Sequence, residues 1–188
     1  MTRAALALAL MIAGPAAFAE PMTGAEAKEV LFAPVKAEVE VLAAAGLPED
    51  HAKALELVGI DQPYFGAIAI APDEGLLSEA TVAAANFHDT GAATVAALAE
   101  CNAKKTSAND CIIAAYIRPA GWKDAGFSLS SDATAAFEGY DKKTGALAIS
   151  VATGAFGMAA GDGAREAAKA ACAAKNDKAT DCAVVIEE

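Results

Sequence analysis

Short apolar runs and longer Ala-rich stretches follow one another along the chain in an order that occurs twice. Each time the pattern predicts two strands joined by a turn, then a helix and a third strand, because short apolar runs favour strands and longer ones favour helices. In the first copy we expect strands over 64–71, 76–85 and 111–117 and a helix over 92–103, capped by Asp89 or Thr90. In the second copy we expect strands over 146–151, 155–160 and 182–186, and a helix capped by Asp162.

The segment before these copies carries signals of its own. Thr23 and Glu26 form a capping box, which predicts a short helix, and residues 35–41 alternate between apolar and charged, as a half-buried strand does. Pro48 is expected to open a further helix that ends at Gly59. Residues 20–62 are therefore predicted to be an α-β-α extension that packs on the first copy and adds a strand to the edge of its sheet.

Spacing supports an internal duplication. Cys101 and Cys111 recur 71 residues later as Cys172 and Cys182, whereas the glycine-led strand at 66–70 recurs 79 residues later. The first copy is therefore eight residues longer, and the extra residues are expected before or within its helix.

These patterns predict one α+β fold class. It consists of two ββαβ repeats, joined sheet to sheet in one compact helix-over-sheet domain, with the N-terminal α-β-α extension. Repeat one covers residues 63–118 and repeat two covers 145–188. Between them, residues 119–144 are predicted to form a linking loop and a helix capped by Ser130 or Ser131.

Four cysteines allow three disulfide connectivities. The equal spacing of the two pairs favours Cys101 with Cys111 and Cys172 with Cys182. Zinc is the competing interpretation, but structural zinc sites use cysteines about two to four residues apart. We therefore expect disulfides, no metal and no cofactor.

The N-terminus has the features of a signal peptide. Arg3 precedes an apolar run over 4–13, a Gly-Pro break follows, and Ala17-Phe18-Ala19 forms a small-x-small cleavage pattern. The run is shorter than the roughly 20 residues that span a bilayer. We expect residues 1–19 to be removed near Ala19, leaving a soluble protein that is periplasmic or secreted.

Charge narrows the classes of partner. The formal net charge of the chain is −11, which disfavours binding to nucleic acid and to anionic membrane surfaces. The acidity is consistent with simple solubility or with recruitment of a basic partner. The expected partner is an unidentified protein or small molecule in the periplasm.

The glycine-led strand, the Ala-rich helix ending at Cys101 and the strand opening at Cys111 resemble the Domain of Unknown Function 4189 family, small exported bacterial proteins. The resemblance covers 64–117 best and 145–188 more loosely, so the chain resembles a tandem member. It implies a compact αβ fold and secretion and carries over no catalytic residue. Proteins similar along the whole length sometimes bear the name 5-aminolevulinic acid synthase, an activity we do not expect, because it needs pyridoxal phosphate in a much longer cytoplasmic fold.

Candidate chemistry is sparse. His51 follows two acids and is typical of a solvated surface, whereas His88 precedes a helix and could poise a base or bind an anion. Tyr64, Phe65 and Trp122 could line a groove, although aromatic residues in such segments are more often packed in the core. Gly161-Asp162-Gly163 lacks the third glycine of a dinucleotide motif, and no Gly-x-Ser-x-Gly elbow occurs. The sequence thus predicts no catalytic residue and favours non-catalytic binding in the periplasm, with a small periplasmic enzyme using His88 as the alternative.

Overall fold

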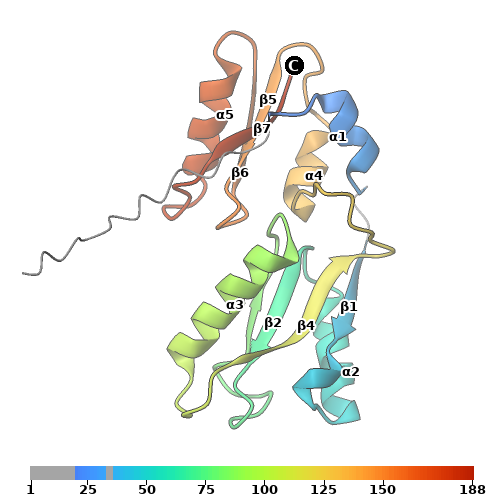
Figure 1. The fold of residues 1–188 in the computed structure, drawn as a ribbon, viewed down its shortest axis with the longest axis vertical. Coiled ribbons are helices and arrows are strands. Elements are labelled where there is room, and N and C mark those ends of the chain that lie inside the picture. Colours follow the sequence, from blue (N-terminus) through green and yellow to red (C-terminus); the bar gives the residue numbers. More distant parts are fainter. Residues whose placement is uncertain (1–19, 33–35) are drawn as a thin grey trace, which may run out of the picture.

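The computed structural model describes residues 20–32 and 36–188, so the predicted signal peptide lies outside the described residues. The chain forms two lobes, each a sheet with helices on both faces (Figure 1). The predicted α+β class with helices over sheets is confirmed. Within the described ranges, no helix is both long and apolar enough to cross a membrane.

The lower lobe contains a four-stranded antiparallel sheet in the order β1-β4-β2-β3. Its strands are β1 (Ala37–Val41), β2 (Gly66–Ile70), β3 (Val82–Ala84) and β4 (Ile112–Pro119). Its helices are α2 (Glu49–Gly59) and α3 (Thr90–Lys104), with a short 3-10 turn, η1 (Ala43–Ala45). As expected, β1 from the N-terminal extension is an edge strand, and the side chain of Asp89 caps α3.

The upper lobe contains a three-stranded antiparallel sheet in the order β6-β5-β7. Its strands are β5 (Gly145–Ile149), β6 (Phe156–Ala160) and β7 (Ala183–Glu187). Its helices are α1 (Gly24–Val30), α4 (Ser131–Phe137) and α5 (Ala164–Ala173). The capping box of α1 and the Ser130 cap of α4 form as predicted.

The central strand of each sheet divides small from large side chains. In β2, Ala67 and Ala69 pack beneath the alanines of α3, while Ile68 and Ile70 pack with Leu55 of α2 on the opposite face. In β5 the even-numbered alanines likewise face α5, and the odd-numbered Leu and Ile face α1 and α4. Alanine on both surfaces lets an Ala-rich helix approach the sheet closely, so the strand sequence determines which helix covers which face.

The structure corrects four predictions. The second strand of the first copy, expected over 76–85, is only Val82–Ala84, because the side chains of Ser78 and Thr81 bond to nearby backbone groups and hold the preceding residues in turns. Asp162 does not cap α5; the cap position is Gly163, whose φ of 75° favours glycine. Two further corrections concern packing.

The first of these is the position of α1. It packs on the upper lobe, where Met22 forms backbone hydrogen bonds with Val185 and Glu187 of β7, so the extension is divided between the lobes (Figure 1). The second is the junction between the repeats. Among the described strands, none pairs with a strand of the other sheet, so the lobes meet through loops and helix ends.

Both predicted cysteine pairs are joined, Cys101 to Cys111 and Cys172 to Cys182, and no described cysteine is free. Each bridge links the C-terminal part of a helix to the segment that enters the following strand.

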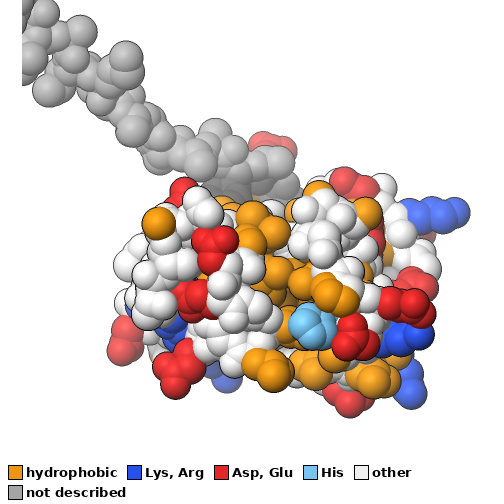
Figure 2. All heavy atoms as spheres, turned by 90° about the horizontal axis from the view of Figure 1, so that it is seen from below, with side chains coloured by type: hydrophobic (Ala, Val, Ile, Leu, Met, Phe, Trp, Pro, Cys, Tyr) orange, Lys and Arg blue, Asp and Glu red, His pale blue; other side chains and the backbone are white. Residues whose placement is uncertain are grey.

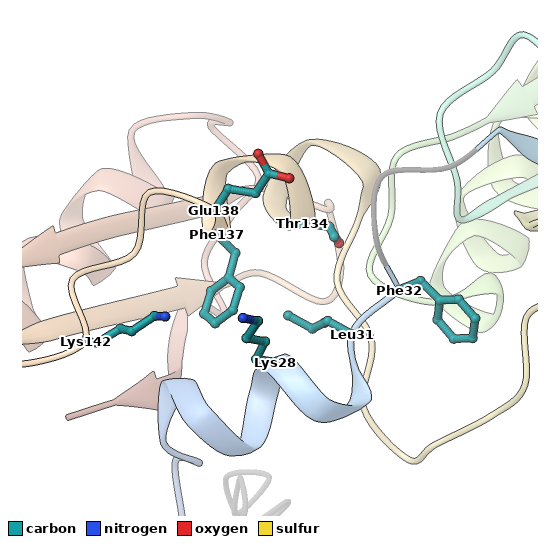
Figure 3. Close-up of a pocket in the computed structure, with 7 residues that line it drawn as sticks. All are labelled: Lys28, Leu31, Phe32, Thr134, Phe137, Glu138 and Lys142. Carbon is teal, nitrogen blue, oxygen red and sulfur yellow. The ribbon is translucent and has the colours of Figure 1, made fainter.

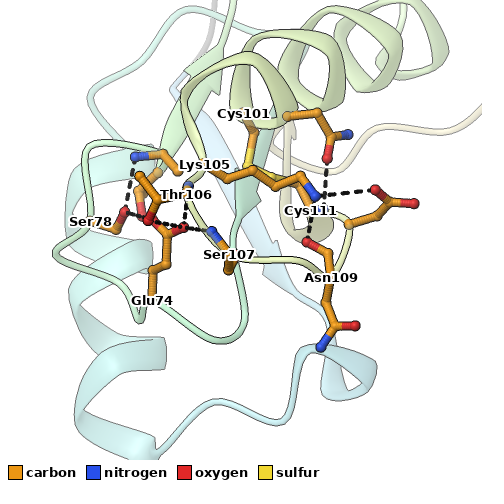
Figure 4. The surroundings of a disulfide bond; sticks show 12 residues. Glu74, Ser78, Cys101, Lys105, Thr106, Ser107, Asn109 and Cys111 are labelled. Carbon is orange, nitrogen blue, oxygen red and sulfur yellow. Dashed lines mark hydrogen bonds and ion pairs between the residues drawn. A yellow bond between two sulfur atoms is a disulfide. The ribbon is translucent and has the colours of Figure 1, made fainter.

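In the lower lobe, the carboxylate of Glu74 accepts hydrogen bonds from the hydroxyl of Ser78 and from the backbone N–H groups of Ser107 and Thr106, the latter two at 2.7 and 2.6 Å (Figure 4). These bonds tie the disulfide loop to the turn after β2 and lower the pKa of Glu74 to about 2.

Replacing Glu74 with Gln is expected to loosen the loop between Cys101 and Cys111 without opening the bridge. The amide cannot match the charge-assisted bonds that the carboxylate accepts. Because the pKa of Glu74 is lowered, its stabilising contribution is present at neutral pH and is lost as pH falls from about 4 towards 2. Faster hydrogen exchange at the amides of Thr106 and Ser107 is the expected readout. Glu79→Gln, an exposed neighbour, is the control, and equal exchange in the two variants would contradict the assignment.

Candidate functional site

His88 lies where the two lobes meet. Its side chain is 2% exposed. Nδ1 accepts a hydrogen bond from the backbone N–H of Ser130 at 3.1 Å, so Nε2 carries the proton and donates it to the carbonyl of Ala155, also at 3.1 Å. Burial lowers the pKa of His88, which favours this neutral form. The imidazole therefore connects the segment before α3 to two backbone groups of the upper lobe.

The start of α4 is held by the lower lobe through further hydrogen bonds. The side chain of Asn86 both donates to the Asp132 carboxylate, at 2.7 Å, and accepts from the Asp132 backbone N–H, at 3.1 Å. The backbone N–H of Ser131 donates to the carbonyl of Tyr64 at 2.8 Å. These contacts fix the orientation of one lobe relative to the other.

Gly154, in the turn between β5 and β6, packs against Asn86. A Cβ atom at Gly154 would lie 2.4 Å from the Asn86 carbonyl oxygen, and the φ of Gly154 is 72°. The junction therefore requires glycine for space as well as for backbone conformation.

Gly154→Ala is expected to destabilise the protein more than Gly161→Ala does. Both positions have positive φ, which costs alanine about 1–2 kcal/mol, but a Cβ at Gly161 meets nothing within 4 Å. The additional loss of unfolding free energy in Gly154→Ala, relative to Gly161→Ala, then measures the clash at the junction between the lobes. Urea unfolding of both variants gives the comparison, and equal losses would contradict close packing of the turn on Asn86.

A pocket of about 380 Å³ opens beside His88, between the lobes. Aromatic rings of Phe65, Trp122 and Phe127 line it together with the carboxylates of Asp89 and Asp124. Residues from the start of α3, from β5 and the turn after it, and from β7 also line the pocket: Thr90, Gly91, Ile149, Val151 and Val185. Its volume lies in the range of about 300–1,000 Å³ that is typical of small-ligand sites.

The structure brings three of the sequence-predicted residues together and keeps others apart. His88, Phe65 and Trp122 all line the pocket. Tyr64 does not: it is 1% exposed, its ring stands edge-on to Phe65 at 5.5 Å, and Phe65 stands edge-on to Trp122 at 5.8 Å. Tyr64 thus lies behind the aromatic wall, where burial raises its pKa. His51 lies on α2 of the lower lobe.

The sequence patterns do not predict Asp89, Asp124 and Phe127 as site residues. Asp89 was assigned only as a helix cap, which it is, since its carboxylate accepts a hydrogen bond from the N–H of Ala92. Asp124 and Phe127 stand in the loop that also carries Trp122, so the composition of that loop was the available signal.

The apolar surface of α2 is a second candidate for an interaction surface. Leu57, Val58 and Ile60, at the C-terminal end of this helix, are 73%, 57% and 45% exposed. The free end of the lower lobe, which Figure 2 shows from below, is a different face, and there too apolar side chains gather between acidic ones. No observed feature indicates what would cover the apolar surface of α2.

Within residues 20–32 and 36–188, no three His, Cys, Asp or Glu side chains are grouped as they would be around a metal ion. The segment Gly161-Asp162-Gly163 is the turn before α5.

Comparisons with protein-family models, curated proteins and solved structures find no match for this chain.

Proposed function

We propose that the chain is exported, folds with both disulfides in the periplasm or outside the cell, and there binds a ligand non-catalytically in the pocket between its lobes. The two joined cysteine pairs support export, because disulfides persist in oxidising compartments and are rare in the cytosol. The predicted signal peptide with cleavage near Ala19 belongs to the same proposal. So does the internal duplication, which the shared order of strands and helix in the two lobes supports.

The observation that carries the binding role is the aromatic pocket beside His88. Three aromatic rings and two carboxylates favour a ligand with a basic group, an amine or a guanidinium, held by the charges and by contact with the rings. Trp122 already binds one such group, since the Arg118 guanidinium lies 5.1 Å from the centroid of its ring. The net charge of −11 would draw such a ligand towards the protein. A free small molecule or a basic side chain of a partner protein would present the same chemistry.

The alternative, a small periplasmic enzyme, has one observation in its favour: His88 and the carboxylates of Asp89 and Asp124 line the same pocket. Against it, both ring nitrogens of His88 are bonded to backbone groups of the upper lobe. Proton transfer by His88 would have to break a contact between the lobes, which favours binding over catalysis.

The resemblance to the Domain of Unknown Function 4189 family is part of the proposal as well. Its support is that β2 and β5 both open at a glycine and that each cysteine pair joins a helix to the next strand. It assigns no residue of the pocket.

Export is tested by fractionating cells that express the full-length chain with a C-terminal tag. The expected product is periplasmic or secreted, begins near Glu20 by mass, and has no thiol that reacts with an alkylating reagent before reduction. An uncleaved chain with reactive thiols in the cytoplasm would overturn this part of the proposal.

Binding is tested with benzamidine, an aromatic cation, and with benzamide, its uncharged counterpart. Nuclear magnetic resonance titration of the oxidised protein should show benzamidine shifting the amides of Gly91 and Gly126, with benzamide weaker. Asp124→Asn removes the charge and keeps an oxygen for the Gly126 N–H, and should weaken benzamidine about threefold. Asp177→Asn, an exposed residue outside the pocket, is the control. Equal binding of both probes, or equal effects of both variants, would contradict the assignment.

A further inference from the structure

A second pocket lies within the upper lobe, between α1 and α4 (Figure 3). Its volume is about 380 Å³, and Leu31, Phe32 and Phe137 supply its apolar surface. Lys28 and Lys142 also line it, one from α1 and one from the turn before β5. The pocket between the lobes shares none of these residues.

The walls of this pocket are fixed from outside it. The N-terminus of α1 is held to the end of the chain, because the backbone N–H of Gly24 donates to the Glu188 carboxylate at 2.9 Å. On α4, the ring of Phe137 stacks on Tyr140, with centroids 5.1 Å apart. Thr134 is buried, and its hydroxyl donates to the carbonyl of Leu129. Ligand binding therefore does not have to order the two helices first.

The lysines give the pocket a local charge opposite to that of the chain. Neither Lys28 nor Lys142 forms an ion pair with another residue that the structure describes. Figure 3 shows their ammonium groups near the ring of Phe137, while the carboxylate of Glu138 points away from them. An apolar floor thus lies next to two cations.

We propose that this pocket binds an amphiphilic monoanion, an unbranched alkyl carboxylate, with its chain on Leu31, Phe32 and Phe137 and its carboxylate at Lys28 and Lys142. A neutral hydrocarbon would leave the ammonium groups of Lys28 and Lys142 without an anionic partner. A polyanion would meet the repulsion of a chain whose net charge is −11. A single carboxylate with an apolar chain matches both the floor and the cations, and this inference does not depend on the binding role of the other pocket.

The test uses sodium dodecanoate, below its micelle concentration, with the oxidised protein in calorimetric and magnetic-resonance titrations. Dodecanoate should bind saturably and shift amides of α1 and α4. Dodecyltrimethylammonium, with a similar chain and the opposite charge, should bind more weakly, and so should acetate, which lacks the chain. Equal binding of the two amphiphiles would overturn the proposal, because it would show nonspecific apolar contact.

Lysine substitutions test whether the carboxylate of dodecanoate binds at Lys28 and Lys142. The double substitution Lys28→Gln with Lys142→Gln should weaken dodecanoate about fivefold, as expected for the loss of two partly exposed charge contacts. Lys143→Gln, the neighbour of Lys142 that does not line the pocket, should leave the affinity unchanged. Since all three lysines are exposed, the variants should fold as the parent does. An equal affinity in the double variant and in Lys143→Gln would contradict the site.

Discussion

Replacing all four cysteines with alanine is expected to lower the free energy of unfolding by about 5–6 kcal/mol, and removing one bridge by about 3 kcal/mol. Each bridge has a sequence separation of 10. Closing a loop of that length in the unfolded chain stabilises the folded state by about this amount in the chain-entropy description. Domains of this size are stable by only about 5–15 kcal/mol, so the variant without bridges should be close to unfolding at 37 °C.

Urea unfolding of three variants, one for each bridge and one for both, measures the effect. The loss in the variant without bridges should equal the summed losses of the two others, because the bridges lie in different lobes and share no contact. If the variant without bridges unfolded at the same urea concentration as the parent, the two disulfides would not stabilise the fold, and the prediction would be wrong.

His88 is expected to be the largest single contributor to the contact between the lobes. His88→Ala should cost about 2–4 kcal/mol, because it leaves the Ser130 N–H buried without a partner, removes one of the hydrogen bonds that the Ala155 carbonyl accepts, and opens a cavity. His88→Gln, which keeps hydrogen-bonding groups, should cost less. His51→Gln changes the other histidine and should have little effect on stability.

The same histidine should make stability depend on pH. Because the pKa of His88 is lowered in the folded state, the unfolded chain binds its proton more readily. Stability is then highest above the unfolded pKa of about 6.5 and falls below it by up to about 1.4 kcal/mol per pH unit. Urea unfolding between pH 7.5 and 5 should show this decline in the parent and in His51→Gln. A decline of the same size in His88→Gln would contradict the assignment.

Much of the fold could be predicted because short-range patterns determine it. Equal cysteine spacing predicted both bridges, and alternation over 35–41 predicted the edge strand at Ala37–Val41. The failures have local causes. Residues 76–81 have strand-like apolar positions, yet the hydroxyls of Ser78 and Thr81 bond to nearby backbone groups and keep the chain turning, with Leu77 98% exposed.

The site was predictable only in part. The sequence predicts His88, Phe65 and Trp122 only as separate candidates. That they share one pocket depends on how the two lobes meet. Phe65, Phe127 and Val185 come from three distant segments of the chain, and no periodic pattern relates them. The pocket between α1 and α4 was missed because α1 packs on the upper lobe rather than on the first copy, through contacts with β7 that no short-range signal encodes. The duplication and the exported location stay predictions.

Native mass spectrometry of the oxidised chain isolated from a periplasmic extract tests the central claim, ligand binding between the lobes, most directly. Parent, Trp122→Ala with Asp124→Asn, and Asp177→Asn should be compared at equal concentration. We predict a stoichiometric bound species that bears a basic group in the parent and in Asp177→Asn, and its loss in the pocket variant. Retention by all three proteins, or by none, would contradict a binding site formed by Trp122 and Asp124.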